Sequence, residues 1–300
     1  MSGTDHLGKE SKHAVVRRAF VLGGLQNAIK GQSRVPGMFG NAEAYERFMG
    51  RWSRLAAAQL VEFAALPDGG RFLDVGSGTG SLSFAIGERH EQAHIVGIDP
   101  SKEYIAFASS KNRFSDRVKF EIGAAQRLPF GDSSFDAAVS LLVFNFIPEP
   151  RTALSEVRRV TKPGGSVSAA VWDYGAGMRM LRVFWDAVVA IDPAAEKLDE
   201  RRMPLCRAGE LSELWRQGGL EAVRERSIDT QMRFASFADY WEPFLLGQGP
   251  AGAYARSRTP RQLTTLRGEI KRRLGISAED RPIDLSGQAW AVRGVVPGRR

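Results

Sequence analysis

The sequence is poor in the residues that cross-link chains or bind metal ions. Its 300 residues include one cysteine, Cys206, which excludes a disulfide within the chain and a zinc site built on several thiolates. The four histidines, at positions 6, 13, 90 and 94, lack the spacing of a zinc-ligand cluster. We therefore expect no metal ion, and a reducing cytoplasmic location is the simplest interpretation of so little cysteine.

Long apolar runs are also missing, since none reaches the roughly 18 to 20 residues that a membrane-spanning helix needs. Near the N-terminus, Arg17 and Arg18 precede a short apolar stretch that faintly resembles an export signal, but Asn27 and Lys30 interrupt it. Residues 1–37 hold six Lys or Arg and two acidic residues. We expect a basic, mobile extension there, with a start at Met38 as an alternative.

The composition is that of a basic globular protein, with 43% hydrophobic and 25% charged residues and a formal net charge of +8. Positive charge gathers in residues 256–273, which contain seven Lys or Arg and one acidic residue. Charge without interleaved aromatic residues is more typical of a solvated helix face than of a nucleic-acid surface. RNA is therefore the weaker alternative partner.

From about residue 70 to 174, short apolar segments alternate with helical ones. This pattern predicts crossover units in a parallel sheet with helices on both faces, the α/β class. We predict one domain at 38–300, with a core at about 68–175 and a helical insertion at about 176–220 and 235–280. Strands are expected near 72–75, 93–99, 117–125, 134–144, 164–174, 220–234 and 287–296, two helices within 41–66, and a turn at 161–165.

Three alternate glycines, Gly76, Gly78 and Gly80, lie where the first strand turns into a helix. Glycine permits tight turns and lets a ligand approach the backbone near the positive end of the following helix. A dinucleotide-binding fingerprint would need glycine at position 81, where Ser81 stands. Asp99 ends the next strand, where a carboxylate can accept hydrogen bonds from both ribose hydroxyls, although it could also merely cap a helix.

Four segments then carry a specific resemblance: FLDVGSGTG at 72–80, IVGIDPS at 95–101, LPFGDSSFDAAVS at 128–140 and ALSEVRRVTKPGG at 153–165. In this order and spacing they resemble class I S-adenosylmethionine-dependent methyltransferases, most closely the branch with the ubiquinone/menaquinone-biosynthesis enzymes. The resemblance covers roughly residues 40–175. It implies a Rossmann-like, mostly parallel sheet of seven strands with an antiparallel last strand, helices on both faces and an insertion after the fifth strand.

The resemblance also implies which residues bind S-adenosylmethionine. The methionine end would lie beside Asp74 and the glycine turn, the ribose on Asp99, the adenine near Pro100, Ala125 and Gln126, and the sulfonium near Leu141 and Leu142. Position 124 departs from the pattern, because Ala124 cannot accept from the adenine amino group as an acidic residue would. The predicted cofactor-binding residues are Asp74, Gly76, Ser77, Gly78, Gly80, Asp99, Pro100, Ala125, Gln126 and Leu141.

Methyl transfer is an in-line displacement that depends mainly on alignment, and it needs a general base only when the acceptor must lose a proton. No histidine follows His94, so a late histidine base is excluded. Asn145, after the fourth strand, and Tyr174, after the fifth, are the candidate catalytic residues. Aromatic side chains expected to line a pocket for a ring or apolar molecule are Tyr45, Trp52, Trp172, Tyr174 and Trp241.

The sequence thus predicts a methyltransferase acting on a small-molecule acceptor. An RNA methyltransferase and a non-catalytic protein that retains the cofactor-binding fold stay as alternatives. Ser81 disfavours a nicotinamide-dependent dehydrogenase.

Overall fold

The computed structural model describes residues 41–298. Its centre is a seven-stranded sheet in the order β3-β2-β1-β4-β5-β7-β6. Strands β1 to β5 pair in parallel, whereas β7 runs antiparallel to both β5 and β6. The expected sheet with an antiparallel last strand is therefore confirmed. The strands are β1 Gly69–Val75, β2 Gln92–Asp99, β3 Val118–Ile122, β4 Phe135–Leu141, β5 Thr161–Trp172, β6 Glu221–Phe234 and β7 Ile283–Val295.

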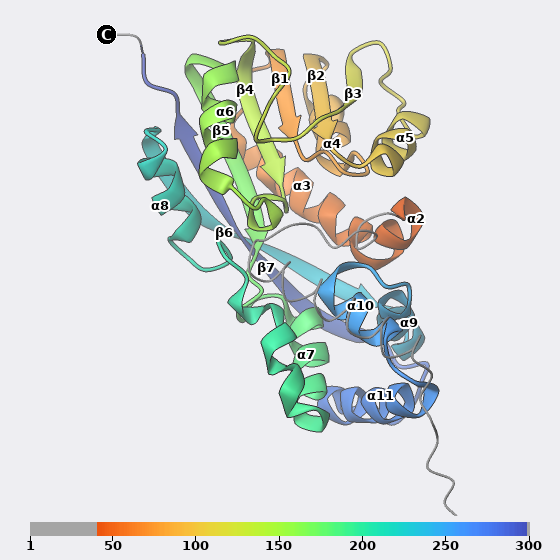
Figure 1. Cartoon of the computed structure of the whole chain (residues 1–300). Coiled ribbons are helices and arrows are strands. Elements are labelled where there is room, and N and C mark those ends of the chain that lie inside the picture. The colour runs from red at the N-terminus through yellow and green to blue at the C-terminus, as the bar shows by residue number, and fades with distance from the viewer. Residues whose placement is uncertain (1–40, 299–300) are drawn as a thin grey trace, which may run out of the picture.

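Helices cover both faces of this sheet (Figure 1). The chain steps along the sheet in one direction from β1 to β2 to β3 and in the opposite direction from β4 to β5. Because the crossovers are right-handed, α4 and α5 lie on one face and α6 on the other. The helices of the core are α2 Ala42–Tyr45, η1 Glu46–Gly50, α3 Arg51–Ala64, α4 Ser81–Arg89, α5 Lys102–Ser110, η2 Phe144–Phe146, α6 Pro150–Val160 and α8 Glu210–Gln217.

The remaining helices gather at the end of the sheet where β1 to β5 terminate, beside the long antiparallel pair β6–β7 (Figure 1). Their core is aromatic, with the rings of Phe184 and Phe244 stacked at 4.4 Å and Tyr254 edge-on to Phe184. Ligands of open α/β sheets bind at this edge, so the insertion adjoins the expected site. These elements are α7 Arg179–Ile191, η3 Pro193–Leu198, η4 Glu200–Arg202, α9 Phe237–Leu245, α10 Gly249–Arg256 and α11 Pro260–Leu274.

The central strands are buried on both faces, as their continuous apolar sequences require. In β4, six of the seven residues are buried, and Asp136 is the half-buried exception. On the outer side of β5, Trp215 of α8 packs edge-on against Phe144 and its Nε1–H donates to the Val167 carbonyl at 3.0 Å. This indole therefore joins α8 to the sheet.

Two segments differ from the expectation. Residues 161–165 were predicted as a turn, but they form the start of β5, whose pairing with β4 shifts register between Phe135 and Ala137. Residues 46–50 form a π-helical turn between α2 and α3, so the predicted pair of helices is in fact one helical run with a bulge. The expected extension at 1–37 lies outside the described residues.

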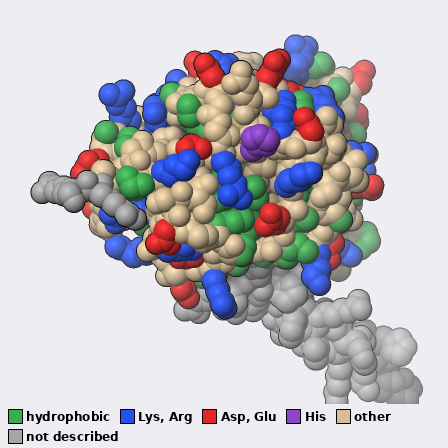
Figure 2. Space-filling view, turned by 90° about the horizontal axis from the view of Figure 1, so that it is seen from above, with side chains coloured by type: hydrophobic (Ala, Val, Ile, Leu, Met, Phe, Trp, Pro, Cys, Tyr) green, Lys and Arg blue, Asp and Glu red, His purple; other side chains and the backbone are tan. Residues whose placement is uncertain are grey.

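The edge of the sheet opposite the insertion carries mixed charge. Seen from that side, Lys and Arg alternate with Asp and Glu, and a histidine lies among them (Figure 2). His94 is exposed near the start of β2, and His90 is buried against the Phe72 ring. Both lie at the amino end of β2, away from the glycine turn. Within residues 41–298, no helix is both long and apolar enough to cross a membrane.

Trp215→Ala should lower the free energy of unfolding by about 3–5 kcal/mol, because a fully buried indole and its hydrogen bond are both lost. Trp215→Phe, which keeps an aromatic ring, should cost about 1–2 kcal/mol. Urea unfolding followed by circular dichroism measures both. A Trp215→Ala protein as stable as wild type would contradict this role of the indole.

Candidate functional site

The glycine turn joins the end of β1 to the end of β2. The N–H groups of Gly76 and Ser77 both donate to the carbonyl of Ile98, at 2.8 and 3.0 Å, and Gly80 N–H donates to the Ser77 carbonyl at 2.8 Å. The turn is thereby closed on itself and fixed to β2. Residues at the ends of these two strands therefore share one edge of the sheet.

Each of the three glycines has a positive φ, but their surroundings differ. A Cβ on Gly76 would lie 2.5 Å from a methyl of Val143, and one on Gly80 would lie 2.7 Å from the Phe84 ring. At Gly78, a Cβ would meet only the Gly76 carbonyl, at 4.0 Å. Gly76 and Gly80 thus allow close packing, whereas Gly78 faces open space where a ligand can approach the backbone.

Asp99, at the end of β2, is held beside this turn. Its Oδ1 accepts from Ser101 N–H at 2.8 Å and its Oδ2 accepts from Gly78 N–H at 3.2 Å. The side chain of Ser101 in turn caps α5 through Tyr104 N–H. The structure therefore brings Asp99 and the glycine turn together, and Ser101, not Asp99, caps α5.

Asp74 lies inside β1, fully buried. Ser83 donates to its Oδ2 at 2.7 Å, while its Oδ1 has no hydrogen-bond partner. Burial raises the pKa of Asp74 to about 7, although the Ser83 hydrogen bond opposes the shift. A buried carboxylate oxygen without a partner is costly, and a ligand that donates to it would relieve this cost.

These features fit the methionine and ribose ends of S-adenosylmethionine. The unpartnered Asp74 Oδ1 and the buried, unpartnered Ser77 hydroxyl offer polar contacts next to the open Gly78 backbone. On the adenine side, Ala125 and Gln126 are half-buried within a turn closed by the Ala124–Arg127 bridge, and Ala124 itself is exposed. Contact of Pro100, Ala125 and Gln126 with the adenine stays a prediction.

The end of β4 carries the second set of unusual features. Leu142 has a φ of +62°, although its N–H donates normally to the Ala170 carbonyl at 2.7 Å. A branched residue in this region is strained, and such strain is concentrated at functional sites. Asn145 follows within η2, only 2% exposed, and neither atom of its amide has a hydrogen-bond partner. A buried amide without partners can orient a ligand.

Tyr174 lies beside this amide, although no hydrogen bond of full geometry joins the two. Burial, then the nearby Glu200 carboxylate, raises the pKa of Tyr174 well above its ordinary value of 10, and closeness to Asn145 lowers it slightly. The phenol is therefore protonated at neutral pH. Tyr174 can donate a hydrogen bond to a ligand, but it cannot serve as a phenolate base.

The expected pocket aromatics divide into two groups. Trp52, Trp172 and Trp241 are buried in the core, where Trp52 packs edge-on against Phe234 at 5.2 Å. Tyr45 is half-buried, and its ring lies 5.6 Å from that of Tyr104. Tyr104 lies on α5, the helix that follows Asp99. Tyr45 and Tyr174 are thus the members of the set with phenols near the site, and the acceptor-binding role of all five stays a prediction.

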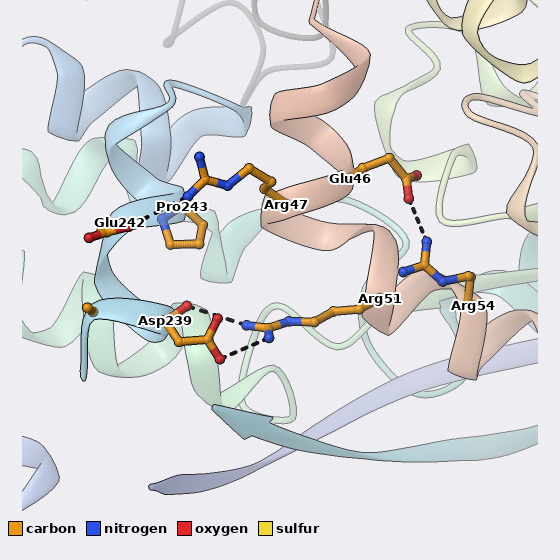
Figure 3. Close-up of a pocket in the computed structure, with 8 residues that line it drawn as sticks. Glu46, Arg47, Arg51, Arg54, Asp239, Glu242 and Pro243 are labelled. Carbon is orange, nitrogen blue, oxygen red and sulfur yellow. Dashed lines mark hydrogen bonds and ion pairs between the residues drawn. The ribbon is translucent and has the colours of Figure 1, made fainter. Parts of the chain in front are cut away.

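A groove of about 250 Å³ lies between α9 and the helical run η1–α3 (Figure 3). Three arginines of that run face it, and each is paired with an acid. Arg51 binds Asp239 at 3.0 Å, Arg47 lies 3.6 Å from Glu242, and Arg54 binds Glu46. The groove is lined by Glu46, Arg47, Arg51, Arg54, Ala238, Asp239, Glu242 and Pro243.

The sequence did not predict three residues that lie near the site. Glu46 accepts a hydrogen bond from Thr79 of the glycine turn at 2.6 Å. Tyr104 packs near Tyr45. Glu200, whose pKa burial raises to about 7, accepts from Trp185 Nε1 at 2.7 Å and lies close to Tyr174. Glu46 lies in η1 and Glu200 in η4, so neither belongs to the strand and turn segments that the sequence singled out.

Part of this chain is similar to known proteins. Residues 73–169 match the family model described as a methyltransferase domain. The chain is 36% identical over 115 residues to a demethylmenaquinone methyltransferase of Deinococcus radiodurans, covering 38% of this chain and 46% of that protein. It is 38% identical over 114 residues to the erythromycin 3''-O-methyltransferase of Saccharopolyspora erythraea, covering 36% of this chain and 37% of that protein.

The fold is shared with more distant proteins. The phosphoethanolamine N-methyltransferase 2 of Haemonchus contortus, solved with phosphomonomethylethanolamine and S-adenosylhomocysteine, superposes with a TM-score of 0.52 at 19% identity. The superposition covers 85% of this chain and 57% of that one. This likeness shows the architecture alone.

Residues 73–169 therefore match a methyltransferase domain, and this part of the chain is similar to the ubiquinone/menaquinone-biosynthesis methyltransferases. The match spans less than half the length of the two curated relatives above.

Asp74→Asn should make the ligand-free protein more stable at pH 8 than wild type, by on the order of a few kcal/mol. The folded-state pKa of about 7 lies above the ordinary value of 3.8, so stability contributed by the protonated carboxyl is lost as the pH rises through 7. Near pH 4 the two proteins should be equally stable. Urea unfolding at both pH values, with the exposed Asp116→Asn as control, measures this; equal stability at pH 8 would contradict it.

Proposed function

We propose that this protein transfers the methyl group of S-adenosylmethionine to a small, ring-bearing acceptor. The observation that carries the proposal is the position of Asp99, oriented by Gly78 N–H and Ser101 N–H beside an open glycine turn. A carboxylate held in this way suits the paired hydroxyls of a ribose. When bound, S-adenosylmethionine supplies an electrophilic methyl group on a sulfonium.

The chain's own residues divide the work of binding. Asp99 would hold the ribose, and Asp74 Oδ1 would accept from the amino group at the methionine end, which its buried position favours. Leu141 and Leu142, both 8% exposed at the end of β4, would exclude water from the reacting centre. Asn145 and Tyr174 would orient the acceptor through hydrogen bonds, since its alignment dominates an in-line displacement.

Proton removal falls to a different group if the acceptor is a hydroxyl or a carbon acid. Tyr174 stays protonated, and both described histidines lie at the far end of β2. Glu200, with a pKa raised to about 7 by burial, is the nearby carboxylate best suited to accept a proton at neutral pH. Its present partner is Trp185 Nε1–H.

The side chains near Asn145 support this class of acceptor. They are mainly aromatic and aliphatic, with Phe146 edge-on to Tyr174 at 6.3 Å. Such surroundings favour a ring or an apolar molecule with few polar groups. The named activities of the relatives, on demethylmenaquinone and on erythromycin, make quinone-like rings and ring-borne hydroxyls the first acceptors to test.

A nucleic-acid substrate has weaker support. Of the seven cations at 256–273, five pair with acids. Arg267 and Lys271 bind Glu279, Arg272 and Arg273 bind Glu269, and Arg258 faces Asp192. Pairing of this kind reduces the charge available to phosphates.

Asp99→Asn should weaken the binding of S-adenosylmethionine and S-adenosylhomocysteine about tenfold or more. The amide keeps an oxygen for Ser101 N–H, but its NH₂ group cannot accept from Gly78 or from a ribose hydroxyl. Isothermal titration of wild type, Asp99→Asn and the exposed Asp116→Asn measures the effect. If folded wild-type protein binds neither compound, the proposed function is wrong.

Asn145→Ala should lower kcat/KM for an accepted substrate at least about tenfold while leaving S-adenosylhomocysteine affinity unchanged. Removing a buried amide without partners should also leave the stability equal to or above that of wild type, because the amide is desolvated without compensation. Tyr174→Phe, which deletes one hydroxyl, should act in the same direction. Methyl-transfer kinetics together with thermal unfolding test both variants, and wild-type kinetics in Asn145→Ala would exclude its role.

A further inference from the structure

The helical run at residues 42–64 is hydrogen-bonded to the glycine turn through Glu46. Glu46, the first residue of the π-helical turn η1, accepts from the Thr79 hydroxyl at 2.6 Å. Thr79 is 5% exposed and lies between Gly78 and Gly80 of the turn. The other Glu46 oxygen accepts from Arg54, which lies on α3 eight residues further along the chain. Both oxygens of the carboxylate are therefore occupied, and its position is defined.

The π-helical turn makes this contact geometrically feasible. An extra residue in one helical turn rotates the preceding side chains relative to the rest of the helix, and such bulges are frequent at functional sites. Tyr45, immediately before it, reaches Ser53 with its hydroxyl at 3.2 Å and packs near Tyr104. The helical run thus contacts both α5 and the glycine turn, the two elements on either side of Asp99.

Gly50 leaves the room that the Glu46 carboxylate occupies. A Cβ at Gly50 would lie 2.5 Å from Glu46 Oε2 and 2.7 Å from Oε1. The backbone of Gly50 is ordinary right-handed helix, with φ −54° and ψ −42°, so conformation alone does not require glycine here. A Cβ at position 50 would collide with the Glu46 carboxylate. This carboxylate is at the far end of a flexible side chain, so a Cβ would displace it.

We propose that Glu46 is a positioning residue for cofactor binding, which holds the glycine turn through Thr79 and is itself seated by the absence of a side chain at Gly50. This rests on the proposed function, because the glycine turn is the proposed cofactor site. Thr79 fixes the backbone of Gly78, whose N–H orients Asp99. Loss of the Glu46 contact should therefore weaken ligand binding without removing any ligand-contacting group.

Gly50→Ala separates positioning from stability. Alanine favours the helix by up to about 1 kcal/mol over glycine, so the melting temperature should stay the same or rise. Its Cβ displaces the Glu46 carboxylate, and affinity for S-adenosylhomocysteine should fall about tenfold. Gly268→Ala is the matched control, since Gly268 also lies within a helix, α11, and a Cβ there would meet nothing within 4 Å. It should gain helix stability and bind as wild type does.

Thr79 provides the second pair of variants. Thr79→Val removes the hydroxyl at nearly constant shape and should weaken binding about tenfold, whereas Thr79→Ser keeps the hydroxyl and should restore it to within about twofold of wild type. The loss should be equal for S-adenosylmethionine and S-adenosylhomocysteine, because position and not charge is changed. Glu43→Gln, an exposed acid on α2, controls for charge.

The experiment is isothermal titration of the full chain and these variants with both compounds, beside thermal unfolding of each. Weakened binding by Gly50→Ala and Thr79→Val, with no fall in the melting temperature of Gly50→Ala and with near-wild-type binding by the controls, supports the role of Glu46. Wild-type affinity in Gly50→Ala or Thr79→Val overturns it while leaving the proposed function intact. Absence of binding by wild type overturns the proposed function, and this inference with it.

Discussion

The turn at residues 76–80 is the constraint on which the site depends. Two successive N–H groups, those of Gly76 and Ser77, converge on one carbonyl at the end of β2, and Gly76 has the positive φ that glycine accepts readily. The missing Cβ of Gly76 also admits Val143, the residue before η2. One turn therefore gathers the ends of β1, β2 and β4, and with them Asp74, Asp99 and Asn145.

The site concentrates features that lower stability. Asp74 keeps one oxygen and Asn145 its whole amide without partners inside the protein, and Leu142 holds a backbone conformation that disfavours its side chain. Such features persist where the surrounding sheet over-determines them, and they are typical of sites prepared for a ligand. The well-packed central strands supply that support, since β4 is buried almost throughout.

In the proposed function, cofactor binding and acceptor selection would belong to two parts of the chain. The family match ends at residue 169, within β5, whereas α7, α9 and α10 follow it and pack at the carboxyl edge of the sheet. The ion pairs of Arg47 and Arg51 with Glu242 and Asp239 connect α9 to the helical run that touches the glycine turn. The two parts are thus in physical contact.

Local sequence patterns determined the order of strands and helices, the glycine turn and the positions of Asp74 and Asp99, because periodicity and glycine spacing act over a few residues. The extent of β5 through the TKPGG segment was missed, since a turn-like composition was overruled by pairing with β4. Tertiary structure alone decided that Glu46 reaches Thr79, 33 residues away in sequence, and that Glu200 lies close to Tyr174. These contacts join segments that are distant in the chain, and no local propensity records which side chains such packing brings together.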